Sequence, residues 1–75
     1  MEIDYVKMGK QLKRIRKARG MKQRDCAAAI QQCSLAFYGH IERGTRRMSM
    51  DTFCALVTAM DPSADELLRA SMKGG

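Results

Sequence analysis

Apolar residues recur every three or four positions along this chain, and no stretch alternates apolar with polar residues over the length of a strand. The clearest example places apolar side chains at positions i, i+3, i+4 and i+7 of one segment: Phe53, Leu56, Val57 and Met60. The segments are short, because Gly20, Gly44 and Pro62 interrupt the pattern with residues typical of helix ends. The sequence therefore predicts an all-α fold of five short helices.

The first two helices are predicted on either side of Gly20. The first has one apolar face formed by four residues: Tyr5, Met8, Leu12 and Ile15. The second is expected to run from about Lys22 to Gln31. It turns three residues inward: Cys26, Ala27 and Ile30.

Each of the other three helices begins near a residue that favours a helix start. Ser34 precedes the third, which ends at Gly44, and Ser49 precedes the fourth. The fifth is expected to start at Pro62. The inward side chains of these three helices are predicted to be Tyr38, Ile41, Phe53, Leu56, Val57, Met60, Ala64, Leu67 and Leu68. Residues 72–75 are predicted to form a frayed tail.

The charge of the chain is concentrated in its first half. The 75 residues are expected to form one domain, with a core over about residues 5–70 and a net charge of +6. Residues 1–47 hold 12 basic and four acidic residues, or +8, whereas residues 48–75 hold two basic and four acidic residues, or −2. This asymmetry favours a polyanionic partner such as nucleic acid, although a basic surface that only keeps the chain soluble has the same composition.

Several classes of function find no support in the sequence. No apolar run reaches the roughly 20 residues that span a bilayer, and no secretory signal is present. The chain is therefore expected to be cytoplasmic, with its three cysteines reduced. Cys26, Cys33 and His40 are seven residues apart, which does not match zinc-ligand spacing. With a single histidine and no nucleophile constellation, we expect no metal, no cofactor and no enzymatic activity.

Residues 22–42 have the order of a helix-turn-helix, which lays one helix across the DNA backbone and the next in the major groove. Over about residues 8–68 the chain resembles the Cro/C1-type (XRE-like) helix-turn-helix family of bacterial and phage regulators. The matching positions are Gly9, Leu12, Arg16, Gly20, Met21, Gln23, Ala27, Ser34, Ile41, Glu42, Arg43, Gly44, Ser49, Thr52 and Leu56. The resemblance implies a five-helix domain of the λ-repressor-like type that binds double-stranded DNA as a repressor-like transcription regulator.

The resemblance also implies roles for individual residues. Arg16 and Glu42 occupy the positions of a salt bridge that ties the recognition helix to the scaffold. Gln23 occupies the position of a phosphate-contacting glutamine at a helix start. The positions at the start of the recognition helix and on its reading face are Ser34, Leu35, Ala36, Gly39 and His40. The positions that contact the DNA backbone after this helix are Arg43, Thr45, Arg46 and Arg47.

Two departures from the family pattern affect the expected binding mode. The turn has Gln32-Cys33-Ser34 where the family usually has Gly-Val-Ser, and one extra residue falls near Gln31. The reading face also lacks the Arg, Lys, Asn or Gln side chains that make bidentate contacts with bases. We therefore expect phosphate contacts and DNA shape to supply much of the affinity, with a modest sequence preference.

Seven methionines in 75 residues suggest an apolar surface in addition to the core. The candidates are Met48, Met50, Met60 and Met72. Such a patch on the last two helices would suit a twofold homodimer, formed in solution or only on DNA, and family members commonly dimerise through that end. An alternative function is a protein-interaction module, antitoxin-like or part of a larger regulatory complex, that docks a partner on Leu35, Ala36 and Phe37.

Overall fold

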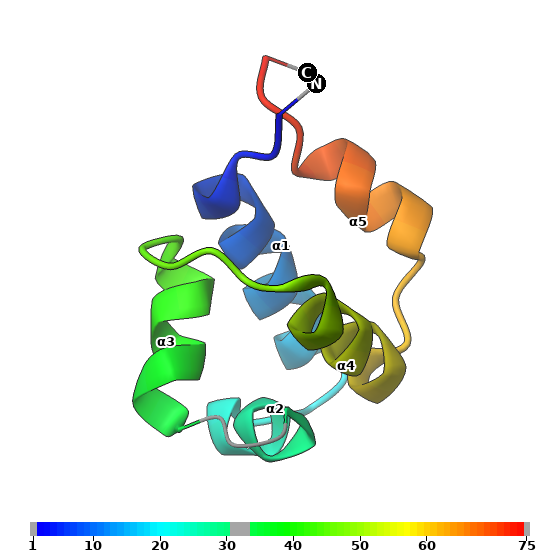
Figure 1. The fold of residues 1–75 in the computed structure, drawn as a ribbon. Coiled ribbons are helices and arrows are strands. Elements are labelled where there is room, and N and C mark those ends of the chain that lie inside the picture. The colour runs from blue at the N-terminus through cyan, green and yellow to red at the C-terminus, as the bar shows by residue number, and fades with distance from the viewer. Residues whose placement is uncertain (1, 31–33, 75) are drawn as a thin grey trace.

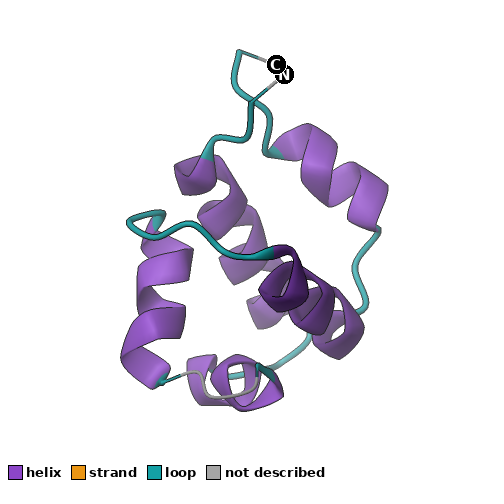
Figure 2. Ribbon diagram, viewed as in Figure 1, coloured by secondary structure: helices purple, strands orange, loops and turns teal. Residues whose placement is uncertain are grey.

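Five α-helices make up the regular structure of residues 2–30 and 34–74, the parts of the chain that the computed structural model describes (Figure 1). They are α1 (Tyr5–Ala18), α2 (Gln23–Ala29), α3 (Leu35–Arg43), α4 (Met50–Met60) and α5 (Ala64–Ala70). Figure 2 shows these helices joined by loops, with no strand in the described part of the chain. The all-α, five-helix prediction is confirmed.

Helix α1 is the central element of the fold. It packs against α3 and α5, which lie on either side of it, and α2 packs against α3 and α4 (Figure 1). Gly9 allows α1 and α3 to approach closely, because a Cβ at this position would lie 2.7 Å from the carbonyl oxygen of Ile41 and still nearer to that of Glu42. The absence of a side chain at Gly9 therefore determines how α3 is seated on the core.

The core is formed by the apolar faces that the helical spacing predicts. Its buried members are Met8, Leu12, Cys26, Ala27, Ile30, Tyr38, Ile41, Leu56, Met60 and Leu67. Ile15 and Phe53 are half-buried against this cluster rather than fully enclosed. The prediction for Leu68 is wrong, since its side chain is exposed. Helix α5 spans only seven residues and buries Leu67, so its neighbour Leu68 is left at the edge of the fold.

Two helix boundaries differ from the sequence-based expectation. Helix α2 ends at Ala29, because Ile30 adopts an extended conformation and directs its side chain into the core. The predicted extra residue near Gln31 and the segment Gln32-Cys33 lie outside the described residues. Helix α5 begins after Ser63, whose hydroxyl accepts a hydrogen bond from the Glu66 amide, and Pro62 precedes this cap.

The predicted fraying of the C-terminal tail is wrong for Met72 and Lys73. The Asp4 amide donates to the Ser71 carbonyl at 2.7 Å, and the Lys73 amide donates to the Glu2 carbonyl at 3.0 Å. The Lys73 ammonium also lies 2.9 Å from the Glu2 carboxylate. These contacts hold the two ends of the chain together, as Figure 1 shows. None of the described helices combines the length and hydropathy required to cross a bilayer.

Candidate nucleic-acid interface

Helix α3 presents one face to the core and the opposite face to solvent. Tyr38 and Ile41 are buried, whereas Leu35 is 53% exposed and Ala36 is also exposed. The Ser34 hydroxyl caps the helix by accepting from the Phe37 amide at 3.0 Å. Gly44 ends it in the left-handed conformation, with φ at 77°. A short helix with two defined ends is thus held with its outward face accessible.

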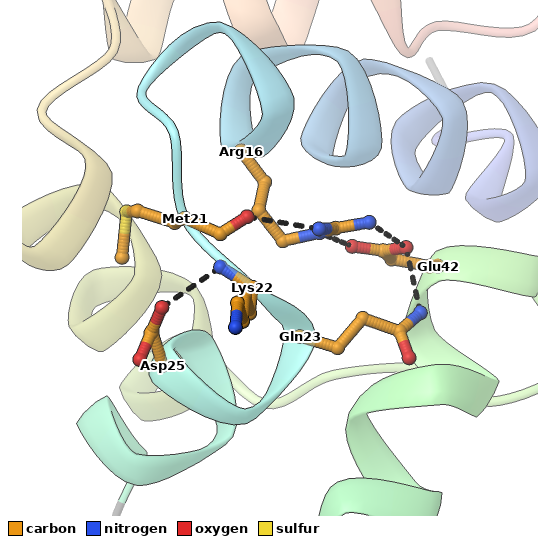
Figure 3. Close-up of polar contacts among 6 residues, drawn as sticks. All are labelled: Arg16, Met21, Lys22, Gln23, Asp25 and Glu42. Carbon is orange, nitrogen blue, oxygen red and sulfur yellow. Dashed lines mark hydrogen bonds and ion pairs between the residues drawn. The ribbon is translucent and has the colours of Figure 1, made fainter.

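The predicted ion pair between Arg16 and Glu42 is present and buried (Figure 3). Arg16 Nε lies 2.6 Å from Glu42 Oε2, and Arg16 Nη2 donates to Glu42 Oε1 at 3.3 Å. The two side chains are 9% and 4% exposed. Arg16 Nη1 also donates to the carbonyl oxygen of Met21 at 3.0 Å, so this one guanidinium ties α1 to α3 and to the start of the α1–α2 turn.

Gln23, the first residue of α2, joins the same cluster. Its Nε2 donates to Glu42 Oε1 at 3.0 Å (Figure 3). Burial acts to raise the pKa of Glu42, but the hydrogen bonds from Arg16 and Gln23 outweigh it and hold this pKa below the ordinary carboxyl value. An ionised Glu42 therefore connects α1, α2 and α3, and it fixes the side chain predicted to contact phosphate.

At its C-terminal end, α3 carries a polar group formed by Arg43, His40 and Thr45. Arg43 Nη2 lies 3.3 Å from His40 Nδ1, and the same ring nitrogen lies 2.9 Å from Thr45 Oγ1. The guanidinium of Arg43 also covers Gly39, which is itself buried. Four residues predicted from the sequence to face DNA are thus neighbours, although Gly39 lies beneath one of them.

The loop after α3 carries two further arginines in different settings. Arg46 is exposed and makes no hydrogen bond or ion pair within residues 2–30 and 34–74. The guanidinium of Arg47 lies 5.9 Å from the centre of the Tyr5 ring at the start of α1. A cation–π contact of this kind restrains the arginine while leaving its N–H edges available.

The electrostatics of this surface are one-sided. Residues 34–50 contain a single carboxylate, Glu42, and that carboxylate is buried against Arg16. Arg43, Arg46 and Arg47 are all exposed. The outward side of α3 and its following loop therefore form a positive surface without an exposed carboxylate of their own, which suits a polyanion.

Two features were missed by reasoning from the sequence. Arg19 is one of the 12 basic residues of the first half, and its Nε donates to the Met60 carbonyl at 2.9 Å and its Nη2 to the Asp61 carbonyl at 3.0 Å. It therefore caps the C-terminus of α4. Basic side chains often donate to the last carbonyl groups of a helix, and this tendency is the signal that could have indicated the role of Arg19.

The second feature is an apolar groove of about 200 Å³ at the opposite end of α4. It is lined by Ile3, Tyr5, Met8, Met48, Ser49, Met50, Phe53 and Leu68. Met50 is 72% exposed, in agreement with the predicted methionine patch, whereas Met60 lies in the core and does not belong to it. Met72, also predicted for the patch, does not line the groove, whereas Phe53 and Leu68 do. The apolar surface therefore combines residues from both ends of the chain.

No grouping of three or more His, Cys, Asp or Glu side chains in the described residues is arranged to hold a metal ion. Two thiols are described, one buried at Cys26 and one exposed at Cys54. Burial raises the pKa of the Cys26 thiol, which favours its neutral, apolar-like form. Cys26 therefore acts as a packing residue beneath α3.

Comparisons with known proteins agree with this geometry. Residues 7–70 match a family model described as a helix-turn-helix domain. The chain is also similar to the solved structure of the restriction-modification controller protein C.AhdI from Aeromonas hydrophila, with 34% sequence identity and a TM-score of 0.75. The match covers 85% of this chain and 96% of that one. No curated protein matches the chain.

Proposed function

Since the chain belongs to the helix-turn-helix domain family, in its Cro/C1 (XRE-like) branch, we propose that it binds double-stranded DNA with a sequence preference and regulates transcription as a repressor. The observation that carries this proposal is an outward-facing α3, held by the Arg16–Glu42 pair, whose C-terminal end and following loop carry three exposed arginines and no exposed carboxylate within residues 34–50. In this arrangement α3 enters the major groove and α2 crosses the backbone. The C.AhdI match, a controller of a restriction-modification system, supports a regulatory role.

Contacts to phosphate are proposed at the start of α2 and in the loop after α3. The hydrogen bond to Glu42 uses one N–H of the Gln23 amide and leaves the other for a phosphate oxygen. Thr45, Arg46 and Arg47 are exposed beyond the end of α3, where they can meet the backbone that flanks the groove. These contacts fix the register of the protein on the duplex without reading its sequence.

Contacts to bases are proposed along the outward face of α3. Leu35 and Ala36 offer apolar contact to a thymine methyl group. Ser34 lies at the helix start, and His40 lies one turn further along with one ring nitrogen already directed at Thr45. Since a histidine and two apolar side chains discriminate weakly, DNA shape is expected to supply part of the preference.

Binding to a labelled duplex is expected to weaken steeply with salt, and Arg46→Ala is expected to weaken it further on every duplex by a similar factor. Each lost phosphate contact should reduce the slope of log affinity against log salt by about 0.9 per protomer. Fluorescence anisotropy between low and moderate salt measures both quantities. Arg69→Ala is the matched control, because it removes one exposed arginine from α5, across α1 from α3.

Three outcomes would contradict this mechanism. A flat salt dependence would exclude phosphate neutralisation, and an Arg46→Ala effect no larger than that of Arg69→Ala would exclude a role for the loop. A wild-type chain that binds no duplex would instead favour the second candidate, a protein-interaction module. The exposed, apolar Leu35 and Ala36 favour that reading, and capture of a protein partner from nuclease-treated lysate would support it.

We also propose that the chain forms a twofold homodimer, at least on DNA, through the apolar groove around Met50. The groove combines Met48, Met50, Phe53 and Leu68, and residues 48–75 carry a net charge of −2, so two copies would not be held apart by the basic half. A twofold dimer places its two recognition helices about 34 Å apart, one turn of the duplex. The preferred site should therefore contain two inverted half-sites at that spacing.

Met50→Glu is expected to raise the dimer dissociation constant by about 100-fold, because the side chain is lost twice in a twofold interface and its burial is worth roughly 1.5 kcal/mol or more each time. Met50 is the first residue of α4, where a carboxylate is compatible with the helix dipole, so the fold should persist. Sedimentation equilibrium measures the constant. Met50→Leu is the control, and equal association by both variants would place the interface elsewhere.

A further inference from the structure

The guanidinium of Arg43 lies back along α3 instead of extending beyond its C-terminal end. A Cβ placed on Gly39, four residues earlier, would lie 3.3 Å from Arg43 Nη1 and 3.9 Å from Cζ. Apart from the neighbouring residues and the backbone of α3 itself, the three atoms nearest to that point all belong to Arg43. The guanidinium therefore rests against the bare backbone at Gly39, in the direction in which helical side chains normally point.

In the tautomer protonated at Nε2, His40 accepts from Arg43 through Nδ1 and holds it in this position. Arg43 Nη2 lies 3.3 Å from His40 Nδ1, and Thr45 Oγ1 approaches the same nitrogen from the loop at 2.9 Å. This is the one hydrogen bond of the Arg43 side chain within residues 2–30 and 34–74, and the guanidinium forms no ion pair there. Most of its five donors therefore have no partner in the described protein, although the group is positioned.

The fold-back changes which part of a duplex Arg43 can reach. It carries the guanidinium about 5.4 Å, one helical turn, towards the N-terminal half of α3, the half that contacts base edges in this type of motif. Leu35, Gly39 and Arg43 share one face at four-residue spacing, and Leu35 is exposed. A planar guanidinium at this place matches the O6 and N7 acceptors of guanine, the commonest specific contact in the major groove.

We propose that Arg43 reads a guanine in each half-site. Gly39 provides a flat surface against which the guanidinium rests, and His40 is the positioning residue. This inference rests on the proposed DNA-binding function. It assigns a base to an arginine that the family resemblance places on phosphate. Arg43 thereby supplies the bidentate hydrogen-bond donor that is missing from the reading face predicted from the sequence.

The test uses the intact chain and duplexes selected by it from a random pool. We expect one guanine per half-site whose replacement by 7-deazaguanine, which lacks the N7 acceptor, weakens wild-type binding by about tenfold. The same replacement should not affect Arg43→Ala. Arg43→Lys keeps the charge but not the planar fork, so it should retain overall affinity at low salt and lose most of the guanine preference.

Gly39→Ala tests the contact surface at Gly39 separately from the arginine itself. The added methyl group meets only the far end of the flexible Arg43 side chain, so the melting temperature should not fall, while the guanine preference should drop severalfold. In the Arg43→Ala background the same change should have no further effect on preference. A fully additive effect of the two substitutions would overturn the role of Gly39.

The failure of this inference can be distinguished from failure of DNA binding itself. If Arg43→Ala weakens all duplexes equally and lowers the salt slope by about 0.9 per protomer, Arg43 contacts phosphate and the inference is wrong, while the proposed function stands. If the wild-type chain binds no duplex at any salt concentration, both are wrong.

Discussion

The variant Glu42→Ala is expected to lose about 3–5 kcal/mol of unfolding free energy. It leaves the Arg16 guanidinium, whose side chain is 9% exposed, without its carboxylate partner. Removing one member of a buried ion pair costs about 3–5 kcal/mol, because the remaining charge stays desolvated. A domain of 75 residues has a total unfolding free energy of roughly 4–11 kcal/mol, so the loss is a large share of the stability. Circular dichroism with urea titration measures the loss.

The control replaces both partners with apolar residues of similar size. Because a well-packed apolar pair avoids the desolvation penalty, Arg16→Met combined with Glu42→Leu should recover most of the lost stability. Duplex affinity should nevertheless remain low, since the Gln23 amide has lost its anchor on α3. If Glu42→Ala unfolds at the same urea concentration as the wild type, the ion pair does not connect the helices as the structure indicates.

The helices that carry this pair could be predicted from the sequence, but the pairing itself was implied only by the family resemblance. Helical periodicity and glycine stops define short helices, and within them Arg16 and Glu42 interrupt or border apolar faces. Helices α1 and α3 pack against each other, and the two residues lie on these neighbouring helices. The family resemblance added their pairing, which the structure confirms at 2.6 Å.

What the sequence did not reveal depends on contacts between distant segments or on side-chain direction. The bridge between Ile3 and Met72 joins the two ends of the chain, and no local signal at either end indicates it. The Arg43 guanidinium could have extended towards phosphate. Its position against Gly39 depends on the side-chain rotamer, which the residue type alone does not determine. Ile30 leaves the predicted helix because its burial outweighs continuation of the helical pattern.

The substitution Gly9→Ala is expected to destabilise the domain by about 3 kcal/mol, although helix propensity alone predicts the opposite sign. Alanine is preferred to glycine inside a helix by about 1 kcal/mol, and Gly9 lies within α1. Its Cβ, however, would meet the backbone carbonyl groups of Ile41 and Glu42, which cannot rotate away as a side chain can. The two helices must separate, and the Arg16–Glu42 geometry must loosen with them. Urea unfolding measures the change.

The matched control is the same substitution at the other helical glycine. Gly39→Ala adds its methyl group opposite a flexible guanidinium that can shift, so most of the propensity gain of about 1 kcal/mol should appear there. A loss of stability from Gly9→Ala and a gain from Gly39→Ala would show that the close approach of the two backbones at Gly9, and not helix propensity, determines how α3 packs against α1. Equal stabilisation at both sites would mean that α1 and α3 are further apart in solution than in the structure, and the orientation of α3 would then need a different explanation.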